Sequence, residues 1–242
     1  MAVPFAFGQN TGGIGGGFYT EGVDYKGFTL MQRGDNPSAI VQLEVQPQGT
    51  DSVFTTGETL RLVTQSGSTL ACAWAARLPE AVTLAEGETV TLSYTFRYIP
   101  PLLFGTENQD IYLTRAGLFY DTDGGDLIAA YKAEDAAWAG YYGLIWMDDS
   151  VTGDFDPPRT HMLRSVAPGS AGSPLNKGTN LDESASSTSY IADEDPIQVT
   201  FSVTKTAEGM VVNHELGKVG EAPSVSLSYT DTNALDAVDI FD

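Results

Sequence analysis

Arginines lie inside several segments of alternating apolar and polar residues, where a guanidinium group could recognise an anion. The four are Arg61, Arg97, Arg115 and Arg164. Because a guanidinium donates two parallel hydrogen bonds, arginines gathered on one sheet surface would suit the carboxylates or sulfates of an acidic polysaccharide. We predict Arg97 and Arg115 as ligand contacts. The alternative is that each arginine pairs with one of the 32 carboxylates as an ordinary cross-strand ion pair, which contributes little.

Aromatic residues gather in a second segment, where they could stack on the apolar face of a sugar ring. Trp138 precedes it, and Tyr141, Tyr142 and Trp146 lie within it. We predict Tyr142 and Trp146 as stacking groups. Both parities of the segment are apolar, however, so the alternative is a central strand whose aromatic side chains belong to the core.

Acidic residues with glycine form a candidate calcium loop in Asp121-Thr-Asp-Gly-Gly-Asp126. Oxygen ligands at alternate positions beside a permissive glycine suit calcium, so Asp121, Asp123 and Asp126 are the predicted ligands. A helix-flanked calcium site is rejected, because its twelfth position needs Glu and residue 132 is Lys. The alternative is a solvated acidic turn. Weaker candidates are Asp148, Asp149, Asp154 and Asp156, and the pair Asp236 and Asp239.

Catalytic side chains are few. His161 lies between Arg159 and Arg164 and is the best candidate for the base of a polysaccharide lyase. His214 shares its parity with Val212 and Leu216, which predicts a core or edge histidine. Cys72, the single cysteine, cannot form an intrachain disulfide, and its apolar neighbours predict a small buried side chain.

The elements that must position these residues are β-strands. Residues 89–98 place Val90, Leu92 and Tyr94 on one parity, and Thr91, Ser93, Thr95 and Arg97 on the other. This period of two predicts a strand with one buried and one presented face. Breakers separate it from other short alternating segments, so the chain is predicted to be an all-β sandwich or barrel. The expected strands are 40–45, 59–64, 69–76, 89–98, 111–120, 141–147, 161–166, 197–204, 210–216, 225–229 and 234–241. Residues 167–189 are predicted to be a long polar loop.

Composition excludes some partners and favours others. The chain of 242 residues has a formal net charge of -20, which disfavours nucleic acid and anionic membranes. No apolar run approaches the roughly 20 residues of a membrane span, so no membrane insertion is expected. The first residues lack the basic and apolar regions of a signal peptide, and we expect a mature exported domain.

In chain order, five segments resemble a concanavalin A-like (laminin-G-like) jelly-roll domain, of a subtype found in exported and surface-anchored proteins of environmental bacteria. They are 59–64, 82–96, Arg115-Ala-Gly-Leu-Phe119, Gly140-Tyr-Tyr142 and the hairpin 199–209. The resemblance covers roughly residues 40 to 242. It implies two curved antiparallel sheets, of which the concave one often binds a glycan, with calcium often held at the rim.

These observations predict a glycine-rich arm over residues 1–22 and one β-sandwich domain of jelly-roll type over 23–242. The predicted function is that of an extracellular or cell-surface, non-catalytic module that binds polysaccharide. A first alternative is a structural subunit of a filament or surface layer that pairs with copies of itself. The glycine-rich arm motivates it, as does the end of the chain at Asp242, where the resembling domains are expected to have one more strand. A second alternative is the lyase centred on His161.

Overall fold

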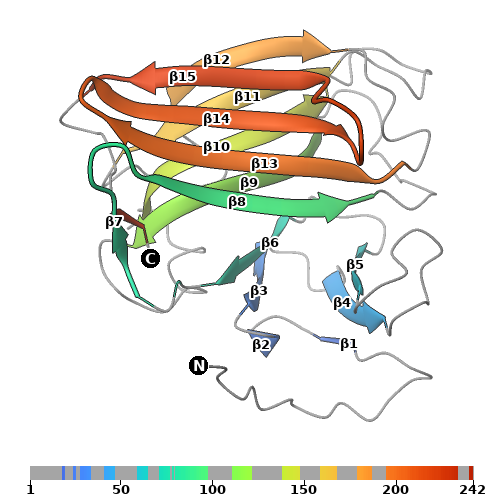
Figure 1. Ribbon diagram of the computed structural model, residues 1–242. Coiled ribbons are helices and arrows are strands. Elements are labelled where there is room, and N and C mark those ends of the chain that lie inside the picture. The colour runs from blue at the N-terminus through green and yellow to red at the C-terminus, as the bar shows by residue number, and fades with distance from the viewer. Residues whose placement is uncertain are drawn as a thin grey trace. The chain divides into compact units, whose positions relative to one another are not determined.

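The structure is a computed structural model in which every described element is a β-strand (Figure 1). It describes residues 18–19, 24–25, 28–33, 41–46, 59–64, 71–76, 78, 80–97, 111–121, 138–147, 159–167, 179–186, 195–233 and 240–241. None of these residues forms a helix, let alone one long and apolar enough to cross a membrane. The all-β prediction is confirmed for this part of the chain.

The chain divides into two compact units. The first comprises residues 1–77 with 126–132, and the second comprises 78–125 with 133–242. Within the first unit, two small antiparallel sheets have the strand orders β1-β4-β5 and β2-β3-β6. Their bounds are β1 Phe18–Tyr19, β2 Asp24–Tyr25, β3 Phe28–Arg33, β4 Val41–Gln46, β5 Thr59–Thr64 and β6 Ala71–Ala76.

The second unit contains two four-stranded antiparallel sheets, ordered β12-β11-β10-β9 and β15-β14-β13-β8, and a short β16-β7 pair. The bounds of the first sheet are β9 Ile111–Asp121, β10 Trp138–Met147, β11 Arg159–Val166 and β12 Thr179–Ser186. Those of the second are β8 Thr89–Phe96, β13 Ile197–Thr206, β14 Gly209–Lys218 and β15 Val225–Asp231. The short pair is β7 Val82–Thr83 and β16 Ile240–Phe241.

The two larger sheets pack face to face in the same strand order. Strand β9 contacts β8, β10 contacts β13, β11 contacts β14 and β15, and β12 contacts β15. Figure 1 shows β13, β14 and β15 in front of β9–β12. The second unit is therefore β-sandwich-like, with both layers antiparallel.

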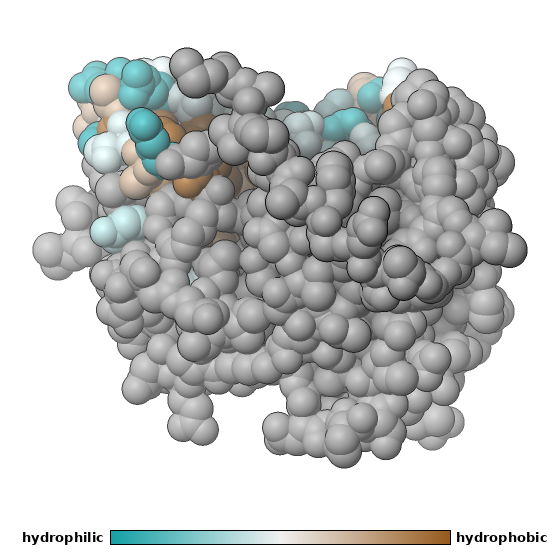
Figure 2. All heavy atoms as spheres, turned by 90° about the horizontal axis from the view of Figure 1, so that it is seen from below, coloured by the Kyte–Doolittle hydropathy of each residue, from teal (hydrophilic) through white to brown (hydrophobic). Residues whose placement is uncertain are grey.

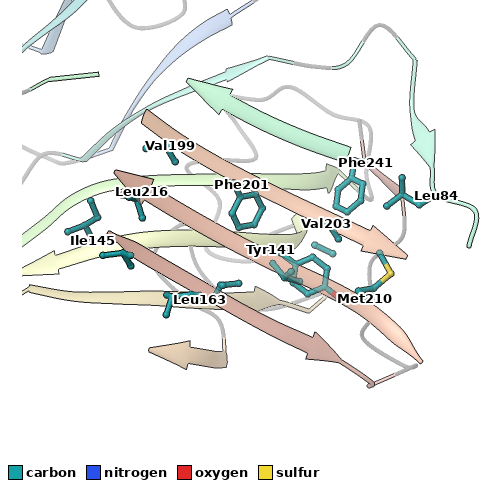
Figure 3. Packing of buried hydrophobic residues seen from close by; sticks show 14 of the residues in the cluster. Leu84, Tyr141, Ile145, Leu163, Val199, Phe201, Val203, Met210, Leu216 and Phe241 are labelled. Carbon is teal, nitrogen blue, oxygen red and sulfur yellow. The ribbon is translucent and has the colours of Figure 1, made fainter. Parts of the chain in front are cut away.

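The core between these sheets follows from alternation along the strands. In β13, Ile197, Val199, Phe201 and Val203 have no exposed surface, while the residues between them are half-buried. Figure 3 shows Val199, Phe201 and Leu216 of one sheet meeting side chains of the other in a single apolar layer. The facing side chains include Tyr141, Ile145 and Leu163. His214 packs in this layer with only 2% of its surface exposed, so of the two predicted positions, core or edge, it occupies the core.

Strand β12 corrects the prediction of a long polar loop over 167–189. Residues 179–186 pair with β11 at the edge of their sheet. The strand was missed because its sequence, Thr-Asn-Leu-Asp-Glu-Ser-Ala-Ser, does not alternate. Among its described side chains only Leu181 packs against the core, and an edge strand with one such contact has no period-two pattern.

The predicted boundary between arm and domain lies mostly outside the described residues. Of residues 1–22, only 18–19 are among those described. The arm of 1–22 and the domain of 23–242 therefore remain predictions.

One buried hydrogen bond joins the two layers. The hydroxyl of Tyr141 in β10 donates to Oδ2 of Asp231 at the end of β15, at 3.0 Å. The other oxygen of this carboxyl accepts from the backbone N–H of Asn233 at 3.0 Å. Tyr141 has no exposed surface and Asp231 only 6%, so this polar pair is satisfied within the core.

Replacing Tyr141 by phenylalanine removes the donor and leaves a buried carboxyl oxygen without its partner. We expect the free energy of unfolding to fall by about 2 kcal/mol, measured by equilibrium urea denaturation. The matched control is Tyr229→Phe. Because Tyr229 is 39% exposed, this substitution should change the free energy of unfolding little. Equal effects of the two substitutions would contradict the assignment.

Candidate functional site

The outward side of the sheet β15-β14-β13-β8 carries mostly hydroxyl and amide side chains. We call this surface the hydroxyl face. Its residues alternate with those of the core, so they are fixed by the same register that buries the apolar ones. Its members are Thr89, Thr91, Ser93 and Thr95 of β8; Gln198, Thr200, Ser202 and Thr204 of β13; Val211, Asn213, Glu215 and Gly217 of β14; and Ser226, Ser228 and Thr230 of β15.

The pairing register aligns these residues in rows across all four strands. One row runs Thr91, Ser202, Asn213, Ser228. The next runs Ser93, Thr200, Glu215, Ser226. The members on β8 and β15 are exposed, and those on the two central strands are half-buried except Gly217, which is buried. Threonine suits this position, because its branched side chain packs on a pleated surface while its hydroxyl remains available.

Side-chain hydrogen bonds orient part of the face. The hydroxyls of Thr89 and Thr204 lie 2.8 Å apart across the β8-β13 pair. Thr95 donates to the Gln198 side-chain oxygen at 2.7 Å, and the Gln198 side-chain nitrogen donates to the Ser93 hydroxyl at 2.7 Å. These bonds hold Gln198 in one orientation. The face is therefore partly preorganised for a ligand.

A small hollow of about 110 Å³ opens at one end of the hydroxyl face. Gly217 lies beside Gln198 in the register, and both residues line the hollow. A Cβ there would lie 3.0 Å from both Ala222 O and Pro223 Cα, so the chain after β14 folds closely over this glycine. The hollow is lined by Gln198, Thr200, Glu215, Leu216, Gly217, Lys218, Gly220, Glu221 and Pro223.

The size of the hollow limits what it can hold. Sites for whole small molecules typically enclose about 300–1,000 Å³. The hollow is therefore too small for a whole small molecule. Figure 2 shows the molecule from below. The described residues at this surface are mostly hydrophilic or intermediate, and apolar ones lie deeper.

The two predicted arginines belong to different sheets. Arg97 follows the end of β8, half-buried and on the parity of Thr95, whereas Arg115 lies in β9 of the other sheet. Arg61 lies in β5 of the first unit. The strand order therefore does not place Arg97 and Arg115 on one sheet. Arg164 in β11 donates from Nε to the side-chain oxygen of Asn180 at 2.7 Å.

Tyr142 lies on the side of β10 away from the shared core. It has no exposed surface and clusters with Leu144, Val166 and Phe119. This burial is typical of a core residue and gives no support to sugar stacking by Tyr142. Trp146 lies in β10 opposite Thr160 of β11, and its side chain is outside the described residues.

The remaining candidates are placed only in part. Asp121 ends β9, while Asp123 and Asp126 lie outside the described residues, so the calcium loop stays a prediction. The other candidate acidic residues, at 148–149, 154, 156, 236 and 239, also lie outside. Within the described ranges no group of three or more His, Cys, Asp or Glu side chains gathers to hold a metal. His161 lies in β11 opposite Ile145 of β10, and its side chain is outside the described residues.

The contribution of β13–β15 to the hydroxyl face was not predicted. The signal was present, because Thr200, Ser202 and Thr204 alternate with the apolar residues of β13. Ser226 and Ser228 alternate in the same way along β15. Only the strand order shows that these rows continue the presented side of β8. Comparisons of the chain with protein-family models, curated proteins and solved structures find no match.

Proposed function

We propose that this protein is an extracellular or cell-surface, non-catalytic module that binds polysaccharide through the hydroxyl face. The observation that carries the proposal is the aligned array of hydroxyl and amide groups over four strands, presented above an apolar core. Hydroxyl and amide groups both donate and accept hydrogen bonds, as the hydroxyls of sugars do. Thr91 and Thr200 form no side-chain hydrogen bond with other described residues, so their hydroxyls can serve a ligand.

The finer fold assignment belongs to the same proposal. A jelly-roll, concanavalin A-like sandwich would present one sheet face to a glycan, as the hydroxyl face is presented. A calcium ion held by Asp121, Asp123 and Asp126 would be a rim site in such a fold. Both ideas rest on the resemblance of the sequence and stay predictions.

The alternatives gain less from the structure. A lyase needs its base and the group that neutralises the substrate on one accessible surface. The side chain of His161 lies outside the described residues, so the lyase stays a prediction. Pairing with copies of the same chain remains a prediction, and size-exclusion chromatography with and without residues 1–20 would test it.

The proposed function is tested by removing two hydroxyls from the centre of the face. In the double variant Thr91→Val/Thr200→Val, shape and strand propensity are kept but two hydrogen-bonding groups are lost. We expect affinity for a retained polysaccharide to fall about tenfold, because each lost hydrogen bond contributes about 0.5–1.5 kcal/mol. The measurement is affinity gel electrophoresis against a panel of neutral and acidic polysaccharides.

The matched control is Thr83→Val, which removes an exposed strand hydroxyl from β7, outside the hydroxyl face. It should bind like the unaltered protein. If no polysaccharide in the panel retards the unaltered protein, the proposed function is wrong. If both variants bind equally well, the ligand lies elsewhere on the protein.

A further inference from the structure

We propose that the hydroxyl face selects uncharged polysaccharides over acidic ones, with the hollow at Gly217 receiving one substituent of the sugar chain. This inference rests on the proposed function and names its ligand class. It reverses the expectation from the mid-strand arginines, which pointed to acidic polysaccharide. The preferred class of polysaccharide changes because of the charged residues that line the hollow.

The charges at the hollow are mainly negative. Glu215 lies within the hydroxyl face, and Glu221 lies on the loop that borders the hollow. Lys218 also lines it but forms an ion pair with Asp195 at 2.5 Å. A sugar carboxylate or sulfate placed here would meet two carboxylates, whereas a sugar hydroxyl could donate to either of them.

The cation nearest along β8 does not reverse this balance. Arg97 lies beyond the end of β8, at the edge of the sheet, whereas Gly217 lies in β14, two strands away. The partner strand between them contributes Gln198, which is uncharged and already oriented by Thr95 and Ser93. Arg97 is therefore separated from the hollow by neutral side chains.

The charge of the whole chain acts in the same direction. A formal net charge of -20 repels a polyanion over distances set by the ionic strength. The screening length is about 30 Å at 10 mM salt and about 8 Å at 150 mM. A neutral polysaccharide experiences neither the distant repulsion nor the local one at the hollow.

The test compares polymers that differ only in charge: hydroxyethyl cellulose with carboxymethyl cellulose, and dextran with dextran sulfate. Affinity gels are run at about 10 mM and about 150 mM ionic strength, with a polymer-free gel as the mobility reference. We expect retardation by at least one neutral polymer, and none by its acidic partner at low salt. Raising the salt concentration should reduce the difference in retardation between the neutral polymer and its acidic partner, without reversing their order.

Single-charge variants separate the hollow from the net charge. Glu215→Gln and Glu221→Gln should each strengthen binding to the acidic partner of a retained polymer, by about two- to fivefold. Glu208→Gln removes the same charge from the β13-β14 turn, away from the hollow. It should change binding to the acidic polymer less. Arg97→Gln should leave neutral binding unchanged.

The possible results overturn the two proposals separately. Stronger retardation by an acidic polymer, lost in Arg97→Gln, would overturn the inference and leave the proposed function standing. Equal gains for Glu208→Gln and Glu215→Gln would show that net charge, not the hollow, sets the preference. Retardation by none of the four polymers, in unaltered protein and variants alike, would overturn the proposed function itself.

Discussion

Replacing Gly143 by alanine is expected to lower the free energy of unfolding by about 3 kcal/mol or more, because the added methyl group has no space. A Cβ on Gly143 would lie 2.3–2.5 Å from Nδ1, Cγ and Cε1 of His214 on the facing sheet. The imidazole is buried and cannot move aside easily. The ring of Phe201 lies edge-on to it, with 6.0 Å between the ring centres.

The companion variant is His214→Ala, which opens a cavity but removes the obstacle. Because the added methyl group would overlap with the imidazole, the effects of the two substitutions on stability should be strongly coupled. Adding Gly143→Ala to His214→Ala should therefore lower the free energy of unfolding by almost nothing further. The measurement is equilibrium urea denaturation of the two single variants and the double variant. Additive losses would show that the two sheets do not meet at Gly143 and His214.

Replacing Phe241 by alanine is expected to cost about 3–5 kcal/mol, as large-to-small changes in a packed core typically do. Phe241 has no exposed surface and belongs to the main core cluster with Leu84. Its strand, β16, has two residues and pairs with β7, which also has two. So short a pair cannot hold itself in place, and burial of the Phe241 ring must anchor it.

Two further substitutions make this measurement specific. Phe241→Leu keeps most of the apolar volume and should lose much less stability. Val219→Ala, at a side chain that is 50% exposed, should change the free energy of unfolding by about 0.5 kcal/mol at most. A loss at Phe241→Ala no larger than that at Val219→Ala would contradict the burial of the ring.

Much of the all-β fold could be predicted because burial on one side of a strand produces a period of two. Strand β5 was predicted with the bounds that it has, and β13 begins at the predicted residue, Ile197. Strand β12 was missed because its sequence carries only Leu181 as a core contact among its described residues. A period of two arises because alternate residues are buried. An edge strand with one buried side chain therefore shows almost no such pattern in its sequence.

The candidate site could be predicted in part for the same reason. The presented parity of β8, with Thr91, Ser93 and Thr95, follows from its sequence alone. Which strand lies beside it does not, because β8 pairs with β13, about a hundred residues later in the chain. Whether Arg97 and Arg115 share one sheet also depends on this order, since strand neighbours are set by tertiary packing and not by local sequence.

The two layers of the second unit differ in how many of their faces are buried. Strand β10 buries Tyr141 on one side and Tyr142 on the other, whereas β13 buries one side and presents the hydroxyl face. Substitutions in β10 must satisfy packing constraints twice. Those on the hydroxyl face are constrained by little more than strand propensity. A library randomised at the threonines and serines of this face should therefore retain folded members where one at β10 would not.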